Sequence, residues 1–364
     1  MKYFFNLLIC SAITTTAMAQ ESAASFRTYS KFDFVPGEKI TAIEDFTQDQ
    51  IGDFPAKWNS NGSGEVVMMN NQPEKWLKLN SNTTAFPTFV NDLPENFTLE
   101  FRVAVNPDLN YAARFLAIVF TPSTEPKKIF AANFPLRVRV SFTPLKGVNG
   151  KTAVDMYGAD SKSVIRNEMS TNQFFTPQKS MVKVAIWRQK TRLRVYLNEE
   201  KVWDLPQMFD PDANYKKMVF STSNLANDAA FYISGFRLAV GAADTRSKLV
   251  SEGKFSTTGI LFDSNSDKIK PESYGTLKQI AQVLQENSDL KVRIIGHTDS
   301  DGDAAPNLDL SKRRAAAVKA NLSNEFGIEA ARLQTDGKGE SQPAAPNTYA
   351  EGKANNRRVE FVKL

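Results

Sequence analysis

Apolar and polar residues alternate with a period of two through most of the first 240 residues of this 364-residue chain. The segment FTLEFRVAV, from Phe97 to Val105, shows the pattern clearly, and 136–142 and 193–197 repeat it. Such a period places apolar side chains on one face of a strand and polar ones on the other, as in half-buried antiparallel sheets. We therefore predict an all-β domain over residues 20–240, folded as a two-sheet β-sandwich.

The pattern changes in the C-terminal third of the chain. Residues 241–253, GAADTRSKLVSEG, are small or charged and lack any period, which predicts a linker. In 254–364, Leu277, Ile280, Ala281 and Leu284 recur at helical spacing after Pro271. Strands are expected at 258–262, 290–295, 332–335 and 357–362. A sheet with helices on one side, an α+β domain, is the natural packing of these elements.

One stretch of this domain carries a distinct charge pattern. Gly296 to Val318, GHTDSDGDAAPNLDLSKRRAAAV, reads as a strand end, a polar loop and a helix capped by Asn307 or Asp309. Asp299 then lies at the carboxyl end of the strand, and Arg314 directs its guanidinium from the helix towards the loop. The free N–H groups of the first helical turn add donors. This arrangement suits a ligand that carries both an ammonium and a carboxylate.

Three segments in the right order resemble the OmpA-like peptidoglycan-binding domain shared by OmpA, Pal and MotB. GILFDSNSDKIKPES, from Gly259, and NNRRVEF, from Asn355, match its opening and closing segments. The family pattern TDxxG…NxxLSxxRAxxV is met by Thr298, Asp299, Gly302, Asn307, Leu310, Ser311, Arg314, Ala315 and Val318. The resemblance covers 254–364, under a third of the chain. It implies that Asp299 and Arg314 grip the ammonium and carboxylate of diaminopimelate in the stem peptide.

The other expected peptidoglycan-binding residues surround this pair. Thr298 belongs to the same motif, whereas Asn307 and Ser311 either cap the helix or contact the ligand. Arg357 and Arg358 open the last strand, which the family places near the pocket. Because side chains alternate along a strand, we expect only one of these two arginines to face the pocket. The competing interpretation of Asp299 and Arg314 is a structural ion pair at a helix end.

No metal site and no cofactor are expected. His297 is the only histidine, so a His-rich metal site is excluded. The acidic run 299–303 departs from an EF-hand loop because its glycine is fourth and its twelfth position is Leu310. The net charge of +5 is evenly spread, without the basic stripe or polybasic patch that nucleic acids or membrane surfaces attract.

Residues 1–19 have the pattern of a signal peptide. A basic Lys2 and an apolar run precede Ala17-Met18-Ala19, a cleavage site of the A-x-A type. Cys10, the only cysteine, lies inside this segment, so no disulfide is expected. The alternative is a lipid-modified Cys10, although the bulky Ile9 before it is unfavourable. The run is too short to span a bilayer, and no transmembrane segment is expected.

Phrases of the N-terminal region, such as EDFTQDQIGDFPAKWN from Glu44, are similar to laminin-G or concanavalin-type jelly rolls. This looser resemblance implies a fold rather than an activity. Trp58, Trp76, Trp187 and Trp203 could form a sugar-stacking platform, but such residues are more often packed inside. Glu65, Glu100 and Asp204 could serve glycoside hydrolysis, which needs two carboxylates at a defined separation.

Together these patterns predict an exported, non-enzymatic protein of a Gram-negative-type cell envelope, in the periplasm or associated with the outer membrane. The C-terminal domain is expected to bind peptidoglycan without breaking bonds. The N-terminal β-sandwich is expected to be an adaptor or carbohydrate-binding module, with a carbohydrate or an envelope protein as its partner. The alternative is a jelly-roll glycoside hydrolase that the C-terminal domain targets to the wall.

Overall fold

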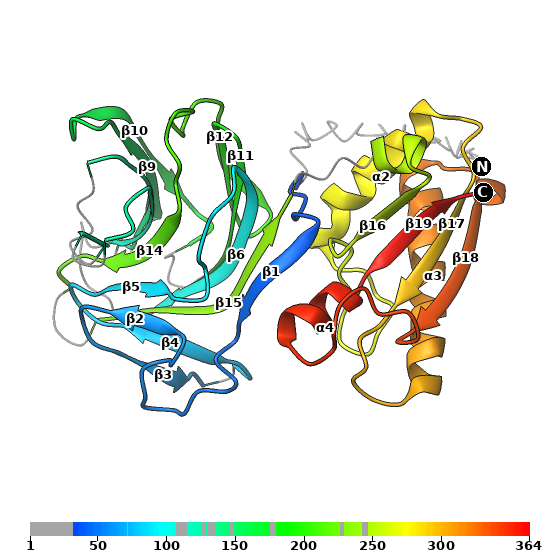
Figure 1. Ribbon diagram of the computed structural model, residues 1–364, viewed down its shortest axis with the longest axis horizontal. Helices are drawn as coiled ribbons and strands as arrows, with labels where there is room; N and C mark the ends of the chain where they lie inside the picture. The colour runs from blue at the N-terminus through cyan, green and yellow to red at the C-terminus, as the bar shows by residue number, and fades with distance from the viewer. Residues whose placement is uncertain are drawn as a thin grey trace, which may run out of the picture. The chain divides into compact units, whose positions relative to one another are not determined.

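A computed structural model describes residues 32–70, 72–106, 115–125, 128–129, 135–145, 149–174, 180–225, 229–241 and 247–364. Two antiparallel sheets make up the N-terminal region, and a mixed four-stranded sheet lies in the C-terminal region (Figure 1). The predicted signal peptide and Cys10 fall outside the described residues.

The larger N-terminal sheet has eight strands. Its order is β13-β12-β11-β6-β15-β4-β3, and β1 also pairs with β15. The strands are β1 (Lys39–Glu44), β3 (Gly64–Met68), β4 (Lys75–Leu79), β6 (Asn96–Val105), β11 (Met181–Gln189), β12 (Arg192–Leu197), β13 (Glu200–Leu205) and β15 (Phe231–Val240). The second sheet runs in the order β10-β9-β8-β7-β14-β5-β2. It comprises β2 (Trp58–Ser60), β5 (Thr84–Pro87), β7 (Leu116–Thr121), β8 (Arg137–Thr143), β9 (Gly150–Tyr157), β10 (Ser163–Thr171) and β14 (Lys217–Thr222).

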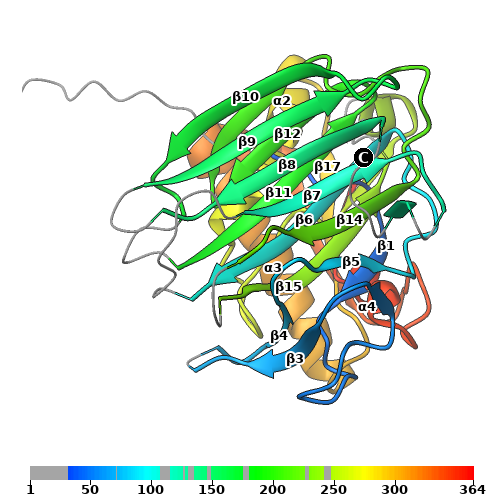
Figure 2. The ribbon, with the colours of Figure 1, turned by 90° about the vertical axis from the view of Figure 1, so that its left-hand side faces the viewer.

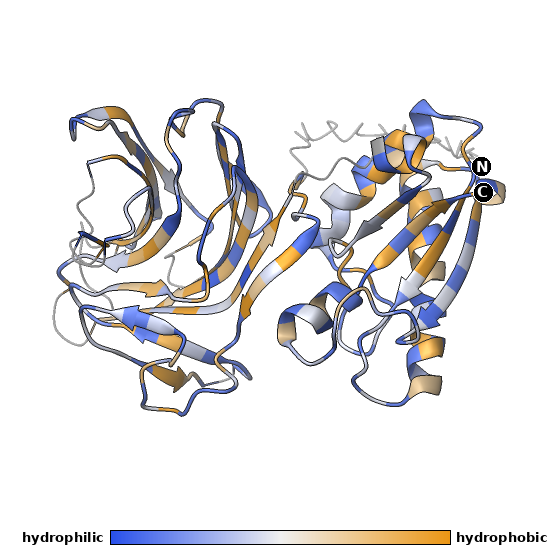
Figure 3. Cartoon of the chain, in the orientation of Figure 1, coloured by the Kyte–Doolittle hydropathy of each residue, from blue (hydrophilic) through white to orange (hydrophobic). Residues whose placement is uncertain are grey.

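The two sheets share one hydrophobic core. Leu99 and Phe101 of β6 belong to the same buried cluster as Ile118 and Phe120 of β7. The strands run side by side in Figure 2, and apolar and polar residues alternate along them in Figure 3. The predicted strand-rich N-terminal region is therefore confirmed. Strand β7 departs from the expected half-buried pattern because all six of its residues are buried.

The C-terminal region combines helices with one sheet, as predicted. The sheet order is β16-β19-β17-β18, in which only β17 and β18 are parallel. Its strands are β16 (Lys254–Thr257), β17 (Val292–His297), β18 (Leu333–Gly339) and β19 (Val359–Lys363). The helices are η1 (Ser247–Ser251), η2 (Pro271–Ser273), α2 (Tyr274–Glu286), α3 (Ala304–Phe326), η3 (Ala330–Arg332) and α4 (Ala350–Asn356). Among the described residues, no helix has both the length and the apolar composition that crossing a membrane requires.

Several boundaries differ from the predicted ones. The first strand of this sheet is Lys254–Thr257, and the predicted strand 258–262 contributes only a single bridge between Phe262 and Ile269. Helix α3 begins at Ala304, so neither Asn307 nor Asp309 caps it. Pro306 fits into the first turn because no intrahelical hydrogen bond needs its missing N–H. Within the predicted linker, η1 is helical and Leu249 is fully buried in the C-terminal core.

The described residues from 32 onwards form one compact unit. Segment 32–36 connects its two regions, because the Phe34 ring packs on Trp187 and Tyr196 of the larger sheet. The Phe34 backbone meets α2, where a Cβ on Gly275 would lie only 2.3 Å from the Phe34 carbonyl oxygen. Glycine is thus the residue that allows this close approach.

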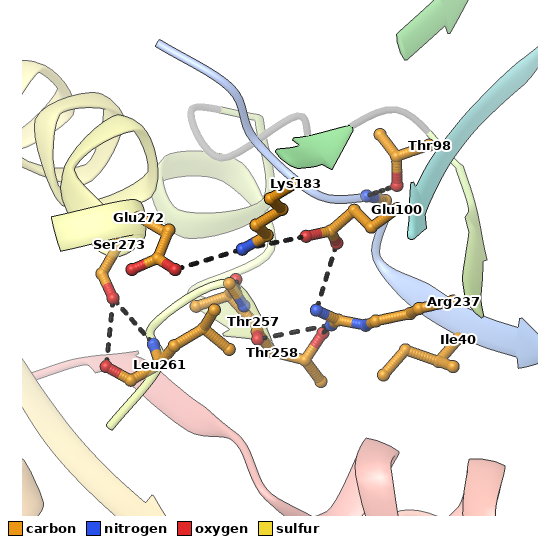
Figure 4. A network of polar contacts seen from close by, with 12 residues as sticks. Ile40, Thr98, Glu100, Lys183, Arg237, Thr257, Thr258, Leu261, Glu272 and Ser273 are labelled. Carbon is orange, nitrogen blue, oxygen red and sulfur yellow. Dashed lines mark hydrogen bonds and ion pairs between the residues drawn. The ribbon is translucent and has the colours of Figure 1, made fainter. Parts of the chain in front are cut away.

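A chain of charged groups crosses between the same two regions (Figure 4). Glu100 of β6 pairs with Arg237 at 3.2 Å and with Lys183 at 3.8 Å. Lys183 reaches Glu272 at 3.2 Å, and Arg237 donates to the Thr258 hydroxyl at 2.9 Å. Glu100 is only 7% exposed, so its charge depends on these two cations.

Strand β1 meets α4 through side-chain amides and carboxylates. The Ile40 N–H donates to Asn355 Oδ1 at 3.0 Å, and Asn355 Nδ2 donates to the Ile40 carbonyl at 2.9 Å. The Ile43 N–H donates to Glu351 Oε1 at 3.3 Å. Strand β1 thus lies close to Arg314 and Arg357, which were predicted to bind the ligand.

Candidate functional site

The candidate site is built on β17, the loop after it and α3. Gly296 lies in β17, where a Cβ would come within 2.2 Å of the Ser311 carbonyl oxygen of α3. The missing side chain lets the helix lie directly on the strand. Leu310, Ala315, Val318 and Leu322, which share the predicted apolar face of α3, are all buried. The strand end and the helix are thereby held in fixed register.

Asp299 lies in the loop and is already engaged. Its Oδ1 accepts the Asp301 N–H at 3.2 Å, and its Oδ2 pairs with Arg357 Nη1. Asp299 is 7% exposed, whereas the Arg357 side chain is 48% exposed. Because the Arg357 side chain is half-exposed, it can move into solvent and leave Asp299 to a ligand ammonium.

Arg314 projects from α3 and is half-buried. Its Nε donates to the Ser266 carbonyl at 3.0 Å, and its guanidinium lies 4.9 Å from the Phe262 ring centroid. Burial lowers the pKa of Arg314, and the nearby positive charge of Arg357 lowers that pKa further. No ion-pair partner for Arg314 is found among the residues that the structure describes. Asp299 and Arg314 therefore do not form the structural ion pair that was the competing interpretation.

A cavity of about 210 Å³ lies in front of Arg314. Arg357 and Arg358 both line it, whereas alternation along a strand predicted that only one of them would face the pocket. The physical reason is that both residues precede β19, and Arg357 is the residue that follows α4, so strand alternation does not apply to them. Arg358 is buried and pairs with Glu360 at 2.7 Å, while its Nη1 has no partner. Asp299 does not line the cavity itself but reaches it through Arg357.

The remaining motif residues hold the loop rather than face the cavity. Asn307 Nδ2 donates to the Asp301 carbonyl at 3.0 Å and to Glu340 Oε2 at 2.7 Å. Ser311 is fully buried, and its hydroxyl accepts the Gly339 N–H at 2.9 Å. The buried Thr298 donates its N–H to the Gly339 carbonyl at 3.0 Å, and its hydroxyl has no partner. The side chains of Asn307 and Ser311 and the backbone of Thr298 thus hold the loop that carries Asp299 in place beside β18.

His297, next to the motif, lines the cavity, and so do residues of the N-terminal region that the sequence did not indicate. His297 is 2% exposed, and its Nε2 lies 3.7 Å from Glu360 Oε1. Ile40, Ile43 and Arg237 come from the N-terminal region, and Arg237 Nε is buried without a partner. No sequence signal links them to the motif, because more than 50 residues separate each of them from it.

The residues suggested for sugar stacking and hydrolysis have other partners. Trp58, Trp76 and Trp187 are 5%, 0% and 8% exposed, and the partly buried Trp203 packs against the core. They form no surface platform. Of the three carboxylates, Glu65 pairs with Lys78 at 2.8 Å, Glu100 with Arg237 at 3.2 Å and Asp204 with Arg192 at 2.6 Å.

A family of known proteins matches the region that contains this site. The sequence model of the OmpA family matches residues 261–357. Outer membrane porin F of Pseudomonas aeruginosa is 45% identical over 101 residues, which are 28% of this chain and 29% of that protein. The probable lipoprotein YiaD of Escherichia coli is 44% identical over 103 residues, which are 28% of this chain and 47% of that protein. This chain thus spans less than half the length of either relative.

Solved structures are similar over the same region. The peptidoglycan-associated lipoprotein from Burkholderia pseudomallei is 30% identical, and the match covers 30% of this chain and 89% of that chain with a TM-score of 0.27. The named relatives are outer membrane proteins and lipoproteins. The family match coincides with the helices, strands and loop that carry Asp299 and Arg314, and residues 261–357 are an OmpA family domain.

Proposed function

We propose that the OmpA family domain of this chain binds peptidoglycan non-covalently through diaminopimelate of the stem peptide. Asp299 receives the ligand ammonium, and Arg314 forms two parallel hydrogen bonds to the ligand carboxylate. The observation that carries the proposal is Arg314 itself, a half-buried cation at a cavity without an ion-pair partner among the described residues. A buried charge without a counter-ion is costly, so a ligand carboxylate would relieve that cost.

The test is co-sedimentation of the full chain with purified peptidoglycan. Arg314→Ala should weaken binding by about 2–5 kcal/mol, which is roughly 30-fold or more. Arg314→Lys should restore little, because an ammonium cannot form the planar two-point contact. Asp299→Asn should lose the ammonium contact in the same way. Wall material in which diaminopimelate is amidated or replaced should also bind more weakly.

The adjacent Arg313 provides a matched control. It is 47% exposed and pairs with Asp309 at 2.8 Å, away from the cavity lining. Arg313→Ala should therefore bind peptidoglycan like the parent. If Arg314→Ala also binds like the parent while melting normally, the assignment of the pocket is refuted. A lowered melting temperature with binding retained in the folded fraction would favour a structural role instead.

We further propose that the protein binds the wall without cleaving it. Support comes from the ion pairs that engage Glu65, Glu100 and Asp204, and from relatives whose names describe porins and lipoproteins. Purified protein should release no reducing ends from peptidoglycan or common polysaccharides. Release that a single carboxylate substitution abolishes would establish a glycoside hydrolase instead.

The cellular setting is part of the same proposal. We infer that the protein is located in the cell envelope and that residues 1–19 are its signal peptide. Residues 20–240 then form a jelly-roll adaptor or carbohydrate-binding module. A linker at 241–253 joins this module to the wall-binding domain at 254–364. The outer membrane relatives support the location. Mass spectrometry of the mature N-terminus tests the export signal, and a lipid-modified Cys10 would overturn it.

A further inference from the structure

A second cavity, of about 580 Å³, adjoins the Arg314 cavity. One of its walls comes from the N-terminal region, at β1 and the loop after it, and the other comes from α4 and the residues before it. Ile43 and Arg357 line both cavities, so the two spaces meet at these side chains. A ligand held at Arg314 can therefore extend into the second cavity.

Glu44 is the least satisfied group in this second cavity. It is 5% exposed, its Oε1 accepts the Phe46 N–H at 3.0 Å, and its Oε2 has no hydrogen-bond partner. Burial raises the pKa of Glu44. A buried carboxyl oxygen without a partner is unfavourable, and a ligand hydroxyl or amide N–H would satisfy it.

Several other charged groups of this cavity have partners within the protein. Lys353 pairs with Asp301 at 2.6 Å, and Asp45 accepts the N–H and the hydroxyl of Thr47 at 3.0 and 2.7 Å. Glu351 is occupied by the Ile43 N–H. Lys57 also lines the cavity, and Thr348 and Gln48 add neutral polar groups. This mixture of donors and acceptors can form hydrogen bonds with a ligand rich in hydroxyl and amide groups.

Tyr349 adds an aromatic surface to the same cavity. Its side chain is 69% exposed, which is the highest value among the large apolar residues that the structure describes as exposed. The face of an aromatic ring carries partial negative charge and attracts the weakly positive C–H groups of a sugar ring. An exposed tyrosine beside an unsatisfied buried carboxyl group is a combination suited to an N-acetylated sugar.

We propose that this second cavity is a sugar subsite of the wall-binding site, which holds the N-acetylated saccharide attached to the stem peptide. Tyr349 packs against a ring face, and Glu44 hydrogen-bonds a hydroxyl or amide group. An extended peptide spans about 3.3–3.6 Å per residue, so two residues between sugar and diaminopimelate bridge adjoining cavities. The inference rests on the proposed function, and it makes the N-terminal region a direct participant in wall recognition.

The experiment compares two soluble probes by titration calorimetry with the full chain. One probe is the stem tripeptide ending in diaminopimelate, and the other is the same tripeptide attached to its N-acetylated disaccharide. The disaccharide-tripeptide should bind at least about tenfold more tightly than the tripeptide. Tyr349→Ala should reduce that advantage to below about threefold, while its affinity for the tripeptide alone stays like that of the parent.

Two further variants separate the sugar contact from effects on folding. Glu44→Gln should also reduce the affinity advantage of the disaccharide-tripeptide over the tripeptide. The melting temperature of this variant shows whether the protein still folds. Ile51→Ala provides the control, because Ile51 lies in the loop after β1, is 61% exposed and does not line the cavity. Ile51→Ala should keep the full advantage.

The outcomes distinguish the sugar subsite from the proposed function. Equal affinity of the parent for both probes overturns the sugar subsite and leaves diaminopimelate recognition standing. An advantage that survives in both Tyr349→Ala and Glu44→Gln also overturns it. If neither probe binds the parent, the proposed function fails, and the sugar subsite fails with it.

Discussion

Phe34 should couple the unfolding of the N-terminal and C-terminal regions. Its ring is 2% exposed and lies 5.7 Å from Phe32, 5.4 Å from Tyr196 and 6.1 Å from Trp187. Replacing a buried phenylalanine with alanine costs about 3–5 kcal/mol. Edge-on aromatic pairs contribute about 0.5–1.5 kcal/mol beyond their burial, which places Phe34→Ala in the upper half of that range. We therefore expect a loss of about 4–5 kcal/mol in the free energy of unfolding.

The lost free energy should make the two regions unfold separately rather than lower the stability of the whole protein evenly. Phe34 packs on the outer side of the larger sheet, and its backbone touches Gly275 of α2. Scanning calorimetry of the parent should show the two regions unfolding together, whereas Phe34→Ala should split the signal into two transitions. Phe142→Ala is the control, because Phe142 is fully buried in the core between the N-terminal sheets. It should lower stability similarly without splitting the transition.

Two results would refute this reasoning. One is a single transition in Phe34→Ala at a stability within about 1 kcal/mol of the parent. The other is a parent that already unfolds in two independent transitions, because segment 32–36 would then couple nothing. We also predict that each region folds when expressed alone, and the same calorimetry on separate fragments tests this.

Further predictions concern the OmpA family domain. Glu360→Ala should cost about 3–5 kcal/mol in urea unfolding, because it leaves the buried Arg358 unpaired, and an unchanged midpoint would contradict this. His297, Lys254 and Arg358 hold the pKa of Glu360 well below its usual value of 4.5, against the effect of burial. The stabilisation from Glu360 is therefore complete above about pH 4.5 and is lost as the pH falls further, so Glu360→Ala should respond less steeply to acid than the parent. Gly296→Ala should lower the melting temperature through a clash with the Ser311 carbonyl, at a cost of about 1–3 kcal/mol, and equal melting curves would refute the close-packing argument.

Sequence patterns predicted helices and strands well where their formation depends on residues close together in the chain. A period of two identified strands such as β6 and β11, because alternation depends only on neighbouring residues. The spacing of apolar residues likewise identified α2 and the buried face of α3. Helix and strand ends were less predictable, and α3 begins earlier than predicted because its start depends on how the loop packs.

Contacts between distant segments could not be predicted in the same way. Alternation shows that Ile40 and Ile43 lie in or near a strand, but it does not show which domain they face. Arg237 resembles any polar residue of an antiparallel strand until its contact with Thr258 is seen. The motif located Asp299 and Arg314, yet their partners, Arg357 and the Ser266 carbonyl, come from segments 58 and 48 residues away.

The hydrogen bonds between β1 and α4 have a consequence for solubility. The Ile40 amide and carbonyl groups that Asn355 satisfies belong to a strand paired only with β15, and unpaired groups of this kind are where a foreign strand can add. Asn355 and Glu351 therefore prevent a strand of another molecule from pairing with β1. A protease that removed the C-terminal region would uncover this edge, so proteolysis of the protein would favour self-association of the remaining fragment.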